Sequence, residues 1–167
     1  MSIPRLTRIH RATGRAFFLG VLVTALCVGL LGGVLYGQES SADRDESEVV
    51  VALQRETELF CARDLQAWAR YWRQAPTTTK AYLGGDAPQV LQGWPAVHQY
   101  AVDYLAAHPG PITVPEANPD YAFDFLADDV VNVRYSYDGS AGRVHESRLL
   151  VREGGQWRIA RMTTVKP

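Results

Sequence analysis

The stretch "SRLLVREGGQWRIARM", residues 147–162, decides the fold because it has the pattern of a β-hairpin. Two runs of strand-forming residues flank Gly154 and Gly155, and a glycine pair between such runs is typical of a tight turn. The runs "YAFDFLA" and "VVNVRYSYDG" precede this hairpin, and turn-forming residues separate all of them. Their spacing predicts an antiparallel meander of four strands in the C-terminal part of the chain.

Two registers are open for the last hairpin. A two-residue turn at the glycine pair would place Arg158 opposite Val151. A three-residue or bulged turn would instead place Trp157 and Ile159 on the face of Leu149 and Val151. We favour the second register because it keeps one face of the sheet apolar, and a slip of one residue exchanges the two faces.

The preceding hairpin can also be given a register. If its turn is centred on Ser140, Arg134 faces Glu146 and Tyr135 faces His145. Alternation along the strand then directs His145 inward, toward the face that ends in apolar residues. The charged positions of the same strand are expected on a solvated face: Glu146, Arg148 and Arg152.

Helical patterns precede the sheet. An apolar stripe begins at Val49 and predicts a first helix, and Asp64 is placed to cap a second helix from Leu65 to about Gln74. The run "TTTKAYLGG" predicts a short strand. "GWPAVHQYAVDYLAAHPG" predicts a third helix, with a proline in its first turn and another proline behind it.

The N-terminus differs from the rest of the chain. Residues 1–15 carry four arginines and no acid, and residues 16–37 form a run of 22 residues without a charge. A helix of that length measures about 33 Å, enough to cross a hydrocarbon core of about 30 Å. The positive-inside rule places residues 1–15 in the cytoplasm and the C-terminal domain outside it. Cleavage as a signal peptide is the alternative and would give a secreted or periplasmic domain, although signal peptides usually have apolar runs of about 7–15 residues.

Partners can be narrowed from the same pattern. A small residue every fourth position gives the predicted transmembrane helix one face for close helix packing and a homodimer: Ala25, Gly29, Gly33 and Gly37. The sheet face is a second candidate for a homodimer interface. Residues 38–47 are polar and acidic and are expected to be a linker. Without the four N-terminal arginines the chain has 13 basic and 18 acidic residues, which argues against nucleic acid as a partner.

Three segments resemble the SnoaL-like branch of the nuclear transport factor 2-like superfamily: "FCARDLQAWARYW", "LQGWPAVHQYAVDYL" and the opening hairpin. The family's marks are an Asp that restarts a helix, a Gly before the third helix and a final Gly-x-Trp-(Arg/Lys)-Ile strand. They match Asp64, Gly93, Gly155, Trp157, Arg158 and Ile159. The resemblance covers roughly residues 47–165. It implies an α+β fold over residues 48–167, a cone-like curved antiparallel sheet wrapped on three helices and preceded here by one transmembrane helix.

The resemblance also implies a pocket between the sheet and the helices. Enzymes of this family use carboxylate, His or Tyr side chains there for proton transfer next to carbonyl groups, and many other members have no reaction. The pocket-lining candidates in this chain are His145, Tyr135, Tyr104, Tyr82 and Trp72, with His145 as the candidate base. No catalytic constellation emerges from the sequence, and no spacing of ligands suggests a metal site. No glycine-rich phosphate loop is present, so no cofactor is expected.

We therefore expect a membrane-anchored extracytoplasmic domain that binds a small apolar ligand or a protein partner without catalysis. An isomerase, dehydratase or cyclase that transfers protons in the cone is one alternative. An assembly module of a cell-envelope complex is another. An enzyme should direct a buried His or carboxylate into the pocket, whereas an assembly module should show a filled pocket and an apolar outer patch.

Overall fold

A computed structural model describes residues 41–84, 87–112, 119–139 and 142–167. The predicted transmembrane segment 16–37 and its stripe of small residues lie outside these ranges. Within the described residues, no helix has the length and apolar character needed to cross a membrane.

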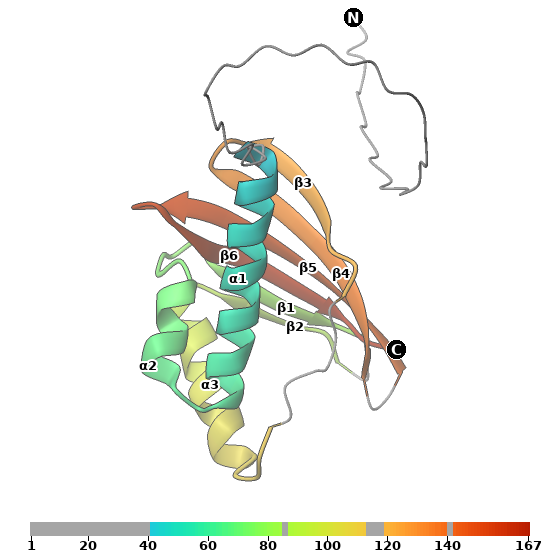
Figure 1. The fold of residues 1–167 in the computed structure, drawn as a ribbon. Coiled ribbons are helices and arrows are strands. Elements are labelled where there is room, and N and C mark those ends of the chain that lie inside the picture. Colours follow the sequence, from blue (N-terminus) through green and yellow to red (C-terminus); the bar gives the residue numbers. More distant parts are fainter. Residues whose placement is uncertain (1–40, 85–86, 113–118, 140–141) are drawn as a thin grey trace, which may run out of the picture. The chain divides into compact units, whose positions relative to one another are not determined.

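The described residues form a six-stranded sheet with helices on one of its faces (Figure 1). We call the face covered by the helices the inner face. The strand order is β2-β1-β6-β5-β4-β3. The elements are α1 (Ser41–Cys61), α2 (Leu65–Trp68), the 3₁₀ helix η1 (Ala69–Tyr71), β1 (Thr79–Leu83), β2 (Gln89–Gln92), α3 (Trp94–Ala107), β3 (Ala122–Ala127), β4 (Val130–Gly139), β5 (Gly142–Glu153) and β6 (Gln156–Val165).

This architecture confirms the α+β class, the three helices and the meander from β3 to β6. The sheet is not wholly antiparallel, however, because β1 pairs with β6 in parallel. The sequence pattern does not predict β2, a four-residue strand at the edge of the sheet.

Helix α1 begins at Ser41 and so includes most of the segment 38–47 that was expected to be a linker. Its first turn carries Asp43, and an acid there is favoured by the helix dipole. Asp45 and Glu48 accept hydrogen bonds from Arg152 of β5. These acids join the start of α1 to the sheet. Arg152 therefore faces α1, and the prediction that it lies on a solvated face is wrong.

The caps of the other helices follow the sequence closely. The Asp64 carboxylate accepts a hydrogen bond from the Ala67 N–H at 2.9 Å, which confirms Asp64 as the N-cap of α2. This helix is shorter than predicted, because its last turn tightens into η1. Gly93 precedes α3 with a φ of 83°, a conformation that suits glycine, and Pro95 lies in the first turn as predicted.

The last hairpin has the two-residue turn, so the register that we favoured is wrong. Val151 pairs with Arg158, and both turn glycines have positive φ, as a tight primed turn requires. The irregularity lies farther along, where Leu149 pairs with Arg161 and Leu150 with Ile159. This shift restores the apolar face without a longer turn.

The predicted register between β4 and β5 is wrong by one residue. Tyr135 pairs with Glu146, and Ser136 pairs with His145. A slip of one residue exchanges the faces of β5. His145 is therefore exposed on the outer face, while the buried, inward positions of β5 are Val144, Glu146, Arg148 and Leu150.

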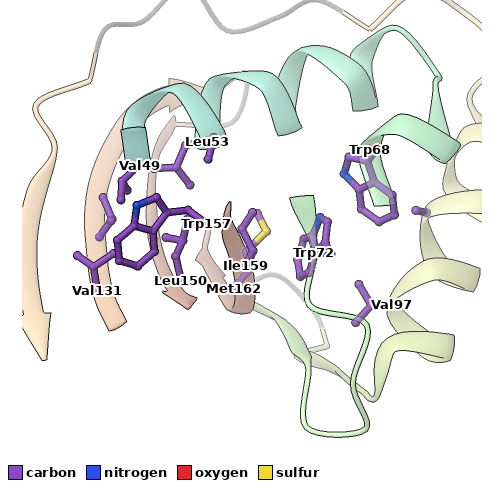
Figure 2. Packing of buried hydrophobic residues seen from close by; sticks show 13 residues of the cluster. Val49, Leu53, Trp68, Trp72, Val97, Val131, Leu150, Trp157, Ile159 and Met162 are labelled. Carbon is purple, nitrogen blue, oxygen red and sulfur yellow. The ribbon is translucent and has the colours of Figure 1, made fainter. Parts of the chain in front are cut away.

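The apolar core lies between α1 and the sheet and extends to α3 (Figure 2). Trp157 and Ile159 of β6 lie in this core with Val49 and Leu53 of α1. Trp157 is only 4% exposed. The hairpin that decides the fold thus supplies large side chains that close the core.

Candidate functional site

Four charged side chains are buried on the inner side of the sheet. They are Glu56 of α1, Lys80 of β1, and Glu146 and Arg148 of β5, and none is more than 6% exposed. We call these four residues the inner charge cluster. Burying a single charge costs several kcal/mol, so buried charges are normally paired. Two acids and two bases make this cluster electrically neutral when all four side chains are ionised.

Glu56 is held by three strong donors. Its Oε1 accepts hydrogen bonds from the indole N–H groups of Trp68 and Trp72, at 2.6 and 2.9 Å. Its Oε2 accepts a hydrogen bond from Arg148 Nη1 at 2.7 Å. The Glu56 carboxylate therefore connects α1 to α2, to Trp72 and to strand β5 of the sheet.

Glu146 and Arg148 form the second half of the network. Arg148 donates from Nε and Nη2 to Glu146 Oε2, at 3.0 and 2.9 Å. The hydroxyl of Tyr135 donates to the same oxygen, and that of Tyr137 donates to Oε1 at 3.2 Å. Both carboxylates and the guanidinium of the cluster thus have several hydrogen-bond partners each.

Lys80 is bound differently from the other three. Its Nζ lies over four aromatic rings, 5.4–5.9 Å from the ring centroids of Phe60, Trp72, Tyr82 and Tyr100. A cation over aromatic faces is attracted by the ring quadrupoles. Among the described residues, we find no side chain that accepts a hydrogen bond from this ammonium group. Lys80 is therefore the member of the cluster with unused hydrogen-bonding capacity.

The environment moves the pKa values of these groups in different directions. Burial raises the pKa of Glu56, but Arg148, Lys80 and the two indole donors outweigh it and hold the pKa below its ordinary value. Burial lowers the pKa of Lys80 to about 8, although Glu56 partly offsets the effect. Burial also raises the pKa of Tyr135, which therefore stays a neutral donor to Glu146. The surroundings thus favour the ionised form of Glu56 and lower the pKa of the Lys80 amine toward neutral pH.

The five predicted pocket residues are not all brought together. Trp72 and Tyr135 donate to the cluster, and Tyr82 lies beside Lys80. Tyr104 is not among the rings around Lys80; its ring centroid lies 5.9 Å from that of Phe60. Their role as pocket lining stays a prediction.

His145 is exposed on the outer face, in a groove of about 560 Å³ whose lining includes outward residues of β4 and β6 together with Tyr135 and Glu146. Its Nδ1 is 2.7 Å from the hydroxyl of Ser136, its partner across β4 and β5. The prediction that His145 is the base of an inner pocket is therefore wrong. Among the described residues, no group of three or more His, Cys, Asp or Glu side chains could hold a metal ion.

The sequence pattern places Glu146 and Arg148 on a solvated face, and it predicts no role for Glu56 or Lys80. One signal was available for Glu56, which continues the apolar stripe of Val49 and Leu53 at helical spacing. Lys80 lies two residues before Tyr82, on the same face of a short strand. A charge at an inward position of two separate elements is a sign of a buried ionic network.

Solved structures with this arrangement of helices and sheet are numerous. An NTF2-like protein of unknown function from Shewanella oneidensis covers 73% of this chain and 99% of its own, with a TM-score of 0.56 and 15% identity. A proposed dehydratase of the NTF2-like family from Streptomyces avermitilis covers 76% and 99%, with a TM-score of 0.57 and 14% identity. The association domain of C. elegans CaMKII covers 77% and 100%, with a TM-score of 0.55 and 12% identity.

This chain has the NTF2-like fold. Identities of 12–15% support the fold and leave the activity open, since one fold carries many functions. No family model matches the chain, and no curated protein matches its sequence.

Proposed function

We propose that the domain binds a small molecule on its inner face, with an apolar or aromatic body and a carboxylate or carbonyl oxygen directed at Lys80. The observation that carries this proposal is the contrast within the cluster. Glu56, Glu146 and Arg148 have hydrogen-bond partners, whereas Lys80 is surrounded by rings and has unused donors. An oxygen acceptor on a ligand would supply the missing partner.

The surroundings of Lys80 suit such a ligand. Small-molecule sites are lined mostly by apolar and aromatic groups, with a few polar groups that orient the ligand. Phe60, Trp72, Tyr82 and Tyr100 supply the aromatic part, and Lys80 supplies a directed donor. A buried donor satisfied by an acceptor on the correct ligand also discriminates against analogues that lack the acceptor.

The structure favours a binding function over a reaction in which a carboxylate of the cluster transfers a proton. A general base near neutral pH needs a pKa close to the working pH. The pKa of Glu56 is held below its ordinary value instead, and three donors occupy its oxygens. Glu56 is thus suited to structure and to charge balance.

We further propose that residues 16–37 anchor this domain to a membrane, with the domain on the extracytoplasmic side. The support is the charge-free run of 22 residues behind four arginines. A small ligand in the extracytoplasmic space would then reach the domain without crossing the membrane.

Binding is tested by titrating the full chain with 2-naphthoate and following tryptophan fluorescence, since Trp68 and Trp72 contact the cluster. We expect saturable quenching in the parent and in His145→Ala, and weaker binding in Lys80→Met. The neutral analogue 2-methylnaphthalene should bind more weakly than 2-naphthoate. Equal affinity of the parent and Lys80→Met for 2-naphthoate, with both proteins folded by circular dichroism, would overturn the proposal.

A further inference from the structure

The chain uses arginine for nearly all of its positive charge. Of its 17 Lys and Arg residues, only Lys80 and Lys166 are lysines. A guanidinium keeps its proton at all ordinary pH values, whereas an ammonium can lose one and become a nucleophilic amine. In the inner charge cluster, Arg148 makes the ion pairs, and Lys80 occupies the aromatic surroundings.

Burial of Lys80 favours the neutral amine, whereas the aromatic rings around Nζ attract the ammonium form. Four aromatic rings surround Nζ, and Lys80 is 6% exposed. The amine is thus desolvated, which is one of the ways by which proteins activate a lysine as a nucleophile. The groups that face it from neighbouring elements are Glu56 of α1, Tyr82 of its own strand, Tyr100 of α3, Glu146 and Arg148 of β5, and Lys166 near the C-terminus.

Together with burial, these groups bring the pKa of Lys80 close to neutral pH. Glu56 and Glu146 favour its ammonium form, while Arg148 and Lys166 oppose it. Burial is the largest of these influences, and it lowers the pKa of Lys80 to about 8. At pH 7 an amine with this pKa is about 10% free base, roughly 200-fold more than an ordinary lysine with a pKa of about 10.4.

We propose that Lys80 is a nucleophilic residue that forms a Schiff base with an aldehyde or ketone bound on the inner face. This inference rests on the proposed function and narrows its ligand class to carbonyl compounds.

The step balances without any oxidant or reductant. The lone pair of neutral Nζ forms a bond to the carbonyl carbon, and the π electrons of the C=O bond move to its oxygen. Nitrogen loses a proton and oxygen gains one, which gives a carbinolamine. Loss of that oxygen as water then forms the C=N bond, so that one amine and one carbonyl give one imine and one water.

The presence of two lysines makes the test sharp. The full chain is incubated at pH 7 with benzaldehyde and sodium cyanoborohydride, which reduces an imine to a stable secondary amine. Peptide mass spectrometry then measures the modified fractions of Lys80 and of Lys166, the exposed lysine that serves as an internal control. We expect Lys80 to be modified at least about tenfold faster, because of the larger free-amine fraction of a lysine with a lowered pKa.

Two variants and one denatured sample complete the design. Lys166→Arg should leave the modification of Lys80 unchanged, and Lys80→Arg should leave the slow modification of Lys166 unchanged. Unfolding in guanidinium should abolish the preference for Lys80. Equal or slower modification of Lys80 in the folded parent would overturn the inference. If 2-naphthoate still binds in a Lys80-dependent manner in that case, the proposed binding function stands and only the covalent step fails.

Discussion

Replacing Arg148 by methionine tests whether the inner charge cluster holds the fold together. Arg148 is 4% exposed and donates three hydrogen bonds to Glu56 and Glu146. Methionine has a similar length but no charge, so Arg148→Met leaves two buried carboxylates opposite Lys80 alone. Breaking a buried ion pair on one side costs about 3–5 kcal/mol, a large part of a typical stability of about 5–15 kcal/mol.

The assay is thermal and urea unfolding, followed by circular dichroism. For a domain of this size we expect the Tm to fall by roughly 10–25 °C in Arg148→Met. Arg143→Met is the matched control, because Arg143 pairs with Asp138 in an exposed position with side-chain exposures of 57% and 82%. Such a surface pair contributes about 0–1 kcal/mol, so the control should melt close to the parent.

A second substitution separates charge balance from packing. Arg148→Met combined with Glu146→Gln leaves one buried acid and one buried base, and the cluster is neutral again. We therefore expect the double variant to be more stable than Arg148→Met alone. If the free energy of unfolding of Arg148→Met is within about 1 kcal/mol of the parent's, the cluster is not the electrostatic unit that we describe. The same holds if adding Glu146→Gln lowers the stability of Arg148→Met further.

Further expectations concern the core, the amine, the outer face and the membrane. Trp157→Ala should cost about 3–5 kcal/mol in urea unfolding, and Trp94→Ala, whose side chain is less buried, should cost less; equal costs would contradict the deeper burial of Trp157. Between pH 8 and 9.5 the unfolded lysine binds its proton more fully than folded Lys80, so stability should rise with pH there, and Lys80→Met should remove that rise. His145→Ala should leave 2-naphthoate affinity unchanged, because His145 lies on the outer face; a loss of affinity would place the site in the outer groove. If residues 16–37 are an uncleaved anchor, the chain should resist carbonate extraction and keep its N-terminus; a soluble product that starts near residue 38 would refute this.

Much of the fold could be predicted from periodicity and from turn and cap residues. Asp64, Gly93 and the glycine pair of the last hairpin act through local backbone geometry, so they could be recognised from the sequence alone. Strand β2 could not, because it is four residues long and has an exposed Val90 at the edge of the sheet. The pairing of β1 with β6 joins distant segments and leaves no local signal.

The register of β5 shows where this reasoning fails. Alternation gives two frames, and the rule that charges face water selects the frame with His145 inside. The structure has the other frame, with Glu146 and Arg148 inside. That frame is stable because Glu56 comes from another element and completes the ion pairs. A pattern read along one strand cannot include a partner that lies 92 residues away.

The network also accounts for the isolation of Lys80. Buried polar groups stabilise a structure when every member has partners, and a group without them is costly. Arg148 donates hydrogen bonds to both carboxylates, so the groups that surround Lys80 Nζ are aromatic rings. A second arginine at position 80 would remain charged in these surroundings, whereas a lysine can release its proton. The arrangement that fixes the sheet register therefore also leaves the Lys80 amine without an acceptor among the described side chains. The Lys80→Arg variant tests whether the domain needs the charge or the amine.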